Sequence, residues 1–282
     1  MRTNIIRAII NLVNKPVVEL KEYAQSHNRA NSMGGALEEY IKDIFADTVG
    51  EIDIKKRNRK ISECFSYLGN QNNPPDSIIR GGDAIEVKKI ESKNATLALN
   101  SSYPKAKIFA SSEMITDVCR NCEQWDEKDI IYAVGVVNKN TLLNLCMVYG
   151  VDYAASEGIY TRIKRVITEG INSIPDVEFA KTKELGRVNR VDPLGITYLR
   201  VRGMWGIENP MKVFEYIYQR DESKKFNFMA LINEDKYNTL EYTEELEQLA
   251  IDVQGLDIID VEIKVPDNTA QLKKAKLIKF TV

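Results

Sequence analysis

The residue types best suited to chemistry lie close together between residues 74 and 89. Asp76 leads into one apolar segment, and the triplet Glu86-x-Lys88 lies in the next, after a turn that contains two glycines. Side chains alternate along a β-strand, so Glu86 and Lys88 should point to the same face. Pairing of the two segments across the turn would bring Asp76 near Glu86. These carboxylates, with the main-chain carbonyl of Val87, predict an oxygen-ligand site for Mg²⁺.

A divalent ion at such a site is suited to phosphodiester cleavage, because it neutralises charge on the phosphate and lowers the pKa of the attacking water. Lys88 would orient that water or hold its hydroxide form. The alternative is a strand face with incidental alternating charge, and for a bare acid-x-Lys triplet that is the better explanation. The catalytic interpretation is favoured here because Pro75-Asp76 precedes the triplet, the strand is apolar, and a suitable acid stands upstream.

The upstream acid is Glu38 or Glu39, in a segment whose periodicity predicts a helix over residues 34–46. At about 100° per residue, Glu38 lies at the margin of the apolar stripe and Glu39 on the far, solvated side. Glu38 can therefore face a cleft beside the sheet, although a glutamate that faces only solvent shows the same pattern. Asp83 is a weaker rival for the metal, since a turn residue after two glycines more often caps its own backbone.

Composition places the chain among ordinary globular proteins. It has 282 residues, 44% of them hydrophobic and 28% charged, with a net charge of −2. No stretch approaches the roughly 20 apolar residues of a membrane span, and residues 1–14 lack the apolar core of a signal peptide. We therefore expect a cytoplasmic protein, without membrane contact, whose four cysteines are thiols. The single histidine, His27, excludes chemistries that need paired imidazoles, and we expect no nucleotide cofactor.

Periodicity predicts helices and strands mixed along the whole chain. An α/β fold follows, with a central mixed β-sheet flanked by helices and with additional α+β elements towards the C-terminus. The helix over residues 153–171 should cover the sheet. The predicted helices are residues 3–13, 17–24, 34–46, 153–171, 210–220 and 243–251. The predicted strands are residues 61–68, 77–80, 84–90, 129–137, 142–149, 196–202, 226–232, 258–265 and 276–282, with turns at 71–75 and 81–83.

Several motifs resemble a known group of nucleases. Those that resemble the PD-(D/E)XK nuclease superfamily are Gly34-x-x-x-Glu38 on a helix, then Pro75-Asp76, then Glu86-x-Lys88. Those that resemble NgoPII-type type II restriction endonucleases are residues 100–105 (NSSYPK), 184–195 (ELGRVNRVDPLG) and 200–205 (RVRGMW). The resemblance spans most of the chain.

The resemblance implies a restriction-endonuclease-like core, Mg²⁺-dependent cleavage of double-stranded DNA, and a homodimer. For the namesake of the family it implies the palindrome GGCC. Asp76 and Glu86 would then hold the metal, Lys88 would assist, and Glu38 would be an outer or second-metal ligand. We expect a single domain over residues 1–282, with N-terminal helices in 1–32, a catalytic core at about 33–170, and an accessory recognition and dimerisation part in 171–282.

Contacts to DNA are predicted in two regions. Reading a G·C-rich palindrome needs donors to guanine O6 and N7, which arginine usually supplies in the major groove. The candidates for this role are Arg187, Arg190, Arg200 and Arg202, and the Asn189 amide would add a base or backbone contact. About half of such arginines make only phosphate contacts or surface ion pairs, so we expect at least one base reader. A polar loop that suits phosphate binding, or equally a passive role, contains Asn100, Ser101, Ser102, Tyr103 and Lys105.

Three further signals receive plainer interpretations. Cys119-x-x-Cys122 lacks a second cysteine pair, so a structural zinc is disfavoured. The basic run at residues 55–60 is either a DNA-gripping segment or a solvated loop. Trp125 and Trp205 are interpreted as packing residues rather than base-stacking platforms.

Two other functions stay open on this sequence. A repair or recombination nuclease on the same core would prefer flaps, junctions or ends to a base sequence. A non-catalytic DNA-binding protein would carry a degenerate acidic cluster, and the intact Asp76, Glu86 and Lys88 count against it. The order of recognised bases, the cut position and the number of metal ions are not predicted.

Overall fold

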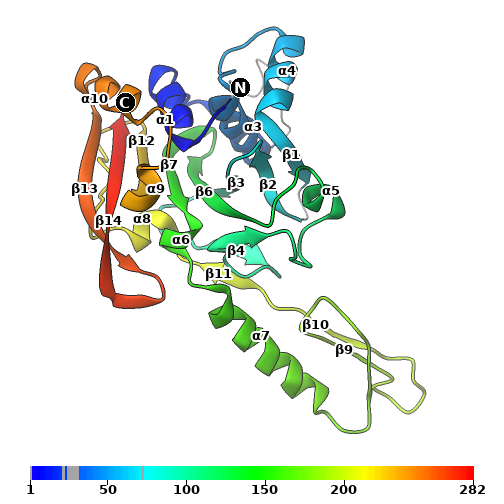
Figure 1. Cartoon of the computed structure of the whole chain (residues 1–282). Coiled ribbons are helices and arrows are strands. Elements are labelled where there is room, and N and C mark those ends of the chain that lie inside the picture. The colour runs from blue at the N-terminus through cyan, green and yellow to red at the C-terminus, as the bar shows by residue number, and fades with distance from the viewer. Residues whose placement is uncertain (1, 21–22, 24–31, 71–72) are drawn as a thin grey trace.

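The computed structural model describes residues 2–20, 23, 32–70 and 73–282. Its centre is a mixed nine-stranded sheet (Figure 1). The strands are β1 (Phe65–Asn70), β2 (Asn73–Ile79), β3 (Ala84–Ile90), β5 (Lys107–Phe109), β6 (Glu127–Asn138), β7 (Thr141–Tyr149), β12 (Asn227–Asn233), β13 (Leu256–Val265) and β14 (Asn268–Thr281). Their order is β1-β2-β3-β6-β7-β12-β14-β13, with β5 paired to β6. β3 runs parallel to β6 and β7 parallel to β12, while the other pairs are antiparallel.

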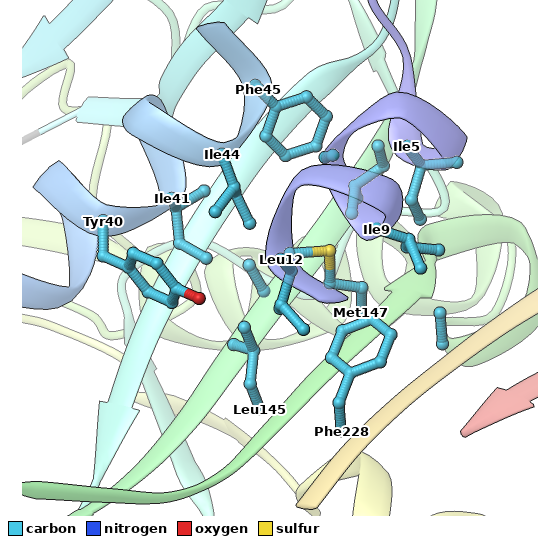
Figure 2. Packing of buried hydrophobic residues seen from close by; sticks show 14 of the residues in the cluster. Ile5, Ile9, Leu12, Tyr40, Ile41, Ile44, Phe45, Leu145, Met147 and Phe228 are labelled. Carbon is cyan, nitrogen blue, oxygen red and sulfur yellow. The ribbon is translucent and has the colours of Figure 1, made fainter. Parts of the chain in front are cut away.

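One face of the sheet is covered by α1 (Ile5–Asn14) and α3 (Met33–Ala46). Side-chain oxygens of Asn4 and Ser32 cap these helices at their first N–H groups. Figure 2 shows side chains that fill this layer, among them Ile5, Ile9, Leu12, Tyr40, Ile41, Ile44, Phe45, Leu145, Met147 and Phe228. Burial of each large side chain contributes about 1.5–3 kcal/mol, so this layer holds α3 firmly against β3.

Shorter helices complete both faces. On the side of α1 and α3 lie α4 (Ile54–Cys64), α9 (Glu234–Tyr237) and α10 (Thr243–Asp252). On the opposite side lie α5 (Asp117–Arg120), α6 (Gly150–Tyr153), α8 (Pro210–Val213) and a two-stranded antiparallel sheet of β4 (Leu97–Asn100) and β11 (Trp205–Ile207). The molecule is therefore a helix and sheet sandwich around one large mixed sheet, as the sequence predicted.

An arm formed by residues 157–201 projects from the body (Figure 1). It contains α7 (Glu157–Asn172) and a three-stranded antiparallel sheet of β8 (Glu178–Phe179), β9 (Gly186–Asn189) and β10 (Leu199–Val201), with β9 in the middle. None of the α7 side chains is buried. The prediction that this helix covers the central sheet is therefore wrong. Its apolar stripe indicated a packing surface but did not identify what packs there.

Most other predicted elements are confirmed. The segments predicted at 3–13, 34–46, 84–90, 129–137, 142–149, 226–232, 243–251 and 258–265 match α1, α3, β3, β6, β7, β12, α10 and β13 within two residues. β12, β13 and β14 belong to the central sheet, although the sequence placed their residues in an accessory part.

α4 replaces the first half of the strand predicted at 61–68. This helix starts because the Asp53 carboxylate accepts hydrogen bonds from the backbone N–H groups of Lys55 and Lys56. The basic run at 55–60 therefore lies on a helix and not in a loop.

Two predicted elements are shorter than expected. Only 210–213 of the segment 210–220 is helical, and 196–202 contains only β10, which belongs to the arm. Residues 73–75 lie in β2 rather than in a turn, while residues 71–72 and His27, with part of the helix predicted at 17–24, lie outside the described residues. Within the described part of the chain, no helix is long and apolar enough to span a bilayer.

Candidate active site

β2 and β3 place the two predicted carboxylates side by side. The strands pair antiparallel with Ser77 opposite Ile85, so Asp76 and Glu86 are the next positions along. The backbone N–H of Val87 donates a hydrogen bond to Oδ2 of Asp76 at 2.6 Å. The strand that carries Glu86 therefore also anchors Asp76.

Glu86 and Lys88 point to the face of the sheet opposite α3. Ile85 and Val87 lie in the buried layer beneath that helix, and Glu86 and Lys88 alternate with them. Nζ of Lys88 lies 2.6 Å from Oε1 of Glu86. Oε2 of Glu86 is buried and has no hydrogen-bond partner among the residues described. A buried carboxylate oxygen without a partner is costly, which favours a ligand at this atom.

Burial and the charge of Asp76 change the pKa values in this group. Burial, and then the charge of Asp76, raise the pKa of Glu86 to about 7. Burial also raises the pKa of Asp76, against the opposing effect of Lys88. Burial acts to lower the pKa of Lys88, but the carboxylates of Glu86 and Asp76 outweigh it and raise that pKa. The acidic pair thus holds a proton more readily than isolated carboxylates, and a bound cation would replace that proton.

α3 brings Glu38, and not Glu39, towards the pair. Burial and the charge of Asp76 raise the pKa of Glu38, which is half-buried. The helical pattern predicted that Glu39 lies on a solvated face, and this prediction is wrong. Glu39 forms ion pairs with Lys42 at 2.9 Å and with Arg57 at 2.6 Å. Sequence reasoning missed this because Arg57 reaches α3 only through the packing of α4.

Asp83, the weaker rival, lies elsewhere. Its carboxylate accepts a hydrogen bond from the Tyr149 hydroxyl at 2.7 Å and pairs with Lys236 at 2.8 Å, rather than capping its own turn. Within the ranges that the structure describes, no three His, Cys, Asp or Glu side chains are grouped to hold a metal. A cation at Asp76 and Glu86 would therefore need further ligands from main-chain oxygens and water.

A cavity of about 170 Å³ opens beside the carboxylates. Of the predicted catalytic residues, Asp76, Glu86 and Lys88 line it and Glu38 does not. The whole polar loop predicted to bind phosphate also lines it, namely Asn100, Ser101, Ser102, Tyr103 and Lys105. The structure thus brings two separately predicted groups of residues to one place.

Lys105 is a buried cation in this cavity. It is 8% exposed, its Nζ lies 3.8 Å from the centre of the Tyr103 ring, and no described carboxylate forms an ion pair with it. Burial lowers its pKa. A buried ammonium group without a counter-ion favours an anionic ligand. Its backbone N–H donates to the Tyr132 hydroxyl at 2.7 Å, a contact that sequence reasoning missed because a tyrosine in an apolar strand has the pattern of a core residue.

The arginine candidates lie on the arm, with Arg202 directly after its last residue. Arg187 and Arg200 are cross-strand neighbours on β9 and β10. Gly186 and Val188, which alternate with Arg187, are buried on the side of α7, so the arginines occupy the opposite face of the small sheet. Arg187 donates to the amide oxygen of Asn189 at 3.3 Å, and this contact orients both side chains.

Acidic side chains pair with the other arginines. Arg200 and Arg202 share the carboxylate of Glu184 at 2.6 and 2.7 Å. Arg190 pairs with Glu178 at 2.9 Å. These arginines are exposed, and exposed ion pairs contribute little, about 0–1 kcal/mol, so a phosphate or a base edge can replace them at small cost.

An aromatic cluster joins the arm to the cavity loop. The ring of Trp205 lies 6.1 Å from that of Tyr103 and 5.7 Å from that of Tyr160, both edge to face. The Tyr103 hydroxyl also donates to Glu157 in the first turn of α7. Trp205 is therefore a packing residue, as predicted, and it lies where the arm begins.

The large mixed sheet flanked by helices, with a carboxylate pair and a lysine on adjoining strands beside a polar loop, has a restriction-endonuclease-like fold. The family model described as NgoPII restriction endonuclease matches residues 3–264. The type II restriction enzyme NgoPII of Neisseria gonorrhoeae is 57% identical over 278 residues, which cover 98% of this chain and 99% of that relative. No solved structure matches. The chain belongs to the NgoPII restriction endonuclease family, and it is a type II site-specific deoxyribonuclease.

Proposed function

We propose that this restriction enzyme cuts both strands of DNA in a Mg²⁺-dependent reaction at a short palindrome. The proposed site is GGCC, which the family resemblance implies, and the proposed active form is a homodimer in the cytoplasm. The observation that carries the proposal is Oε2 of Glu86, a buried carboxylate oxygen without a described partner, beside a second carboxylate in a cavity.

The donor set fits Mg²⁺. Asp76 and Glu86 supply hard carboxylate oxygens, the ligand type that this ion prefers, and the Val87 carbonyl is a third candidate. The raised pKa values of both acids also fit, because a bound cation would offset the burial that raises both pKa values and the charge of Asp76 that raises the pKa of Glu86 further. When bound, Mg²⁺ would neutralise phosphate charge and acidify a water molecule.

The surrounding side chains have separable roles in this proposal. Lys88, held in place by Oε1 of Glu86, would orient the attacking water through its Nζ. Glu38 would accept a hydrogen bond from water in the outer shell. Lys105 would neutralise a non-bridging oxygen of the scissile phosphate, and the hydroxyls of Ser101 and Ser102 would hold neighbouring backbone atoms of the DNA.

The arm would read the bases. Its arginine face carries the guanidinium groups that match guanine O6 and N7 in the major groove. Arg187 and Asn189 are the best-oriented base readers, since they hold each other and pair with no acid in the described residues. Arg190, Arg200 and Arg202 would exchange their glutamate partners for phosphates or bases when DNA binds.

A plasmid digest tests the proposal. Plasmid DNA that contains several GGCC sites is incubated with the enzyme and Mg²⁺, or with EDTA, and the fragment ends are sequenced. We expect discrete fragments with ends at GGCC in Mg²⁺ and intact plasmid in EDTA. Asp76→Asn should not cut, whereas Asp260→Asn, at a side chain 79% exposed on β13, should cut normally.

The other outcomes have distinct meanings. Discrete ends at a different palindrome would overturn GGCC alone. Cleavage that persists in EDTA would overturn the metal site. Diffuse degradation, or a preference for branched over linear substrates, would favour the repair-nuclease alternative.

A further inference from the structure

α7 has one side packed on the small sheet of the arm and another side that no residue described in the structure covers. Ile171 lies against Gly186, and the Thr168 hydroxyl donates to the Leu185 carbonyl at 2.8 Å, so this side faces the small sheet. At about 100° per residue, a second set of apolar residues forms a stripe roughly a quarter-turn away. We call this set the α7 stripe: Ile159, Ile163, Val166, Ile167 and, just past the helix end, Ile174.

The α7 stripe is unusually exposed for aliphatic side chains that are grouped together. Their exposed fractions run from 40% for Ile159 to 57% for Val166. The helix has 16 residues and is about 24 Å long, so the stripe extends over some four turns. Leu199 of β10, 51% exposed, is a further exposed apolar side chain on the α7 side of the small sheet. Contiguous exposed apolar surface of this kind marks an interaction site.

DNA is the wrong partner for this surface. Aliphatic side chains offer no hydrogen bonds or charge to a polyanion. The arginines that suit DNA lie on the other face of the small sheet, as the alternation of Arg187 with Gly186 and Val188 shows. The partner on the α7 side must therefore be a protein with a matching apolar face.

Two charged residues beside the α7 stripe are placed to pair with the same residues of a second copy of this chain. Arg162 and Glu169 are seven residues apart, so they lie on the same margin of the stripe, about two turns from each other. A second α7 packed antiparallel, with its two-fold axis near Val166, would set each Arg162 opposite the partner's Glu169. In the single chain Arg162 forms no ion pair with a described residue, and Glu169 meets only Arg165, at 3.9 Å, with both side chains more than 60% exposed.

We propose that the α7 stripe is the dimer interface, with the stripes of two copies packed antiparallel about a two-fold axis near Val166. This inference rests on the homodimer of the proposed function and assigns its surface. A two-fold contact of one patch with itself is the commonest closed interface. It would also relate the two arginine faces by the same symmetry as a palindromic DNA site.

Sedimentation of stripe variants tests the interface. Ile163→Asp and Val166→Asp replace exposed side chains, so the monomer should keep its circular dichroism spectrum and melting temperature. Each substitution occurs twice in a two-fold contact, and a buried aspartate is costly, so the dimer dissociation constant should rise roughly 100-fold or more. Ile251→Asp, at a side chain 78% exposed on α10, is the matched control and should stay dimeric.

The orientation has its own test. Arg162→Glu alone should weaken the dimer by like-charge repulsion with the partner's Glu169, and adding Glu169→Arg should restore it. Val166→Cys should form a disulfide-linked dimer under mild oxidation, and Ile251→Cys should not. This cysteine variant reports on the interface even where an aspartate variant fails to fold.

The results distinguish a failure of the α7 interface from a failure of the proposed homodimer. A wild-type enzyme that is monomeric at micromolar concentration, with and without DNA, would overturn the homodimer and its surface together. A dimeric wild type with Ile163→Asp and Val166→Asp still dimeric, and Val166→Cys not cross-linked, would overturn only the α7 stripe. A dimer that Arg162→Glu does not weaken would overturn the antiparallel arrangement.

Discussion

The backbone N–H of Val87 donates to Oδ2 of Asp76 at 2.6 Å, one residue after Glu86 turns its own side chain into the cavity. The same short segment of β3 therefore directs the Glu86 carboxylate into the cavity and holds the Asp76 carboxylate in place. A carboxylate held by a main-chain donor needs no side-chain partner to keep its position, so the acidic pair is arranged before any ligand binds.

Mg²⁺ should stabilise the wild-type enzyme and stabilise Asp76→Asn much less. The ion binds only the folded arrangement, so its binding free energy adds to the free energy of unfolding. The measurement is the change in melting temperature between EDTA and Mg²⁺. Asp260→Asn is the control and should show the wild-type change. Equal changes in wild type and Asp76→Asn would contradict the site.

Glu86→Gln should stabilise the metal-free enzyme above neutral pH. The pKa of Glu86 is raised to about 7, so in the window between its ordinary value and 7 the folded state keeps a proton that the unfolded chain releases. The free energy of unfolding therefore falls as pH rises through that window. Glutamine mimics the protonated acid and should remove this loss. In EDTA we expect similar stability at pH 5 and a difference on the order of 2 kcal/mol at pH 8, measured by urea denaturation. Identical pH profiles would show that Glu86 is not perturbed.

Lys88→Ala should abolish cleavage and keep specific DNA binding. Its Nζ is held beside the carboxylates for chemistry, and loss of such a group typically lowers kcat by roughly 10²–10⁴-fold. Cleavage is measured in Mg²⁺ and binding in Ca²⁺ on the same duplex. Lys89→Ala, at a lysine that pairs with Glu91, is the neighbouring control and should keep both cleavage and binding. A parallel loss of binding would move Lys88 to the phosphate contacts.

Lys105→Met should lower cleavage at least about tenfold without lowering the melting temperature. Methionine fills the same space, and the substitution breaks no ion pair while it removes a buried charge. Lys107→Met, at a more exposed lysine paired with Glu127, should leave cleavage unchanged. A fall in melting temperature with unchanged cleavage would give Lys105 a structural role only.

Alanine variants of Arg187, Arg190, Arg200 and Arg202 should fall into two groups. Loss of a guanine reader should cost roughly 1–3 kcal/mol at one base pair and relax discrimination there. Loss of a phosphate contact should weaken cognate and random DNA about equally and reduce the salt slope by about one unit. We expect Arg187→Ala in the first group. Binding in Ca²⁺ to cognate and one-base-altered duplexes at several salt concentrations separates the groups. A uniform loss in all four variants would move base readout to the loop at residues 100–105.

Local pattern was sufficient for most strands of the central sheet and for α1, α3 and α10, although not for α4. The helix over residues 34–46 and the strand at 84–90 could be predicted because their apolar residues recur at the periods of a helix and a buried strand. The proximity of Asp76 to Glu86 followed from strand alternation and a short turn. These features depend on neighbours in the sequence.

The remaining features depend on partners that are distant in the sequence. Glu39 looked solvated because only the packing of α4 brings Arg57 to it. α7 looked like a cover for the sheet because an amphipathic pattern shows that a face is apolar and not what lies against it. The burial of Lys105 likewise arises from the Tyr103 ring and from β6, and its polar loop gave no local sign of it.

The pairing of β4 with β11 has a mechanical meaning. β4 leads into the loop at residues 100–105 that lines the cavity, and β11 is the strand by which the chain returns from the arm. Trp205 opposite Asn100 therefore ties the place where bases would be read to the place where the backbone would be cut. Because the two strands are hydrogen-bonded, a tilt of the arm on DNA would also shift that loop. In the proposed function, base reading and strand cleavage would therefore be coupled through β4 and β11, and an arm bound to the wrong bases would move the loop at residues 100–105 away from the carboxylates.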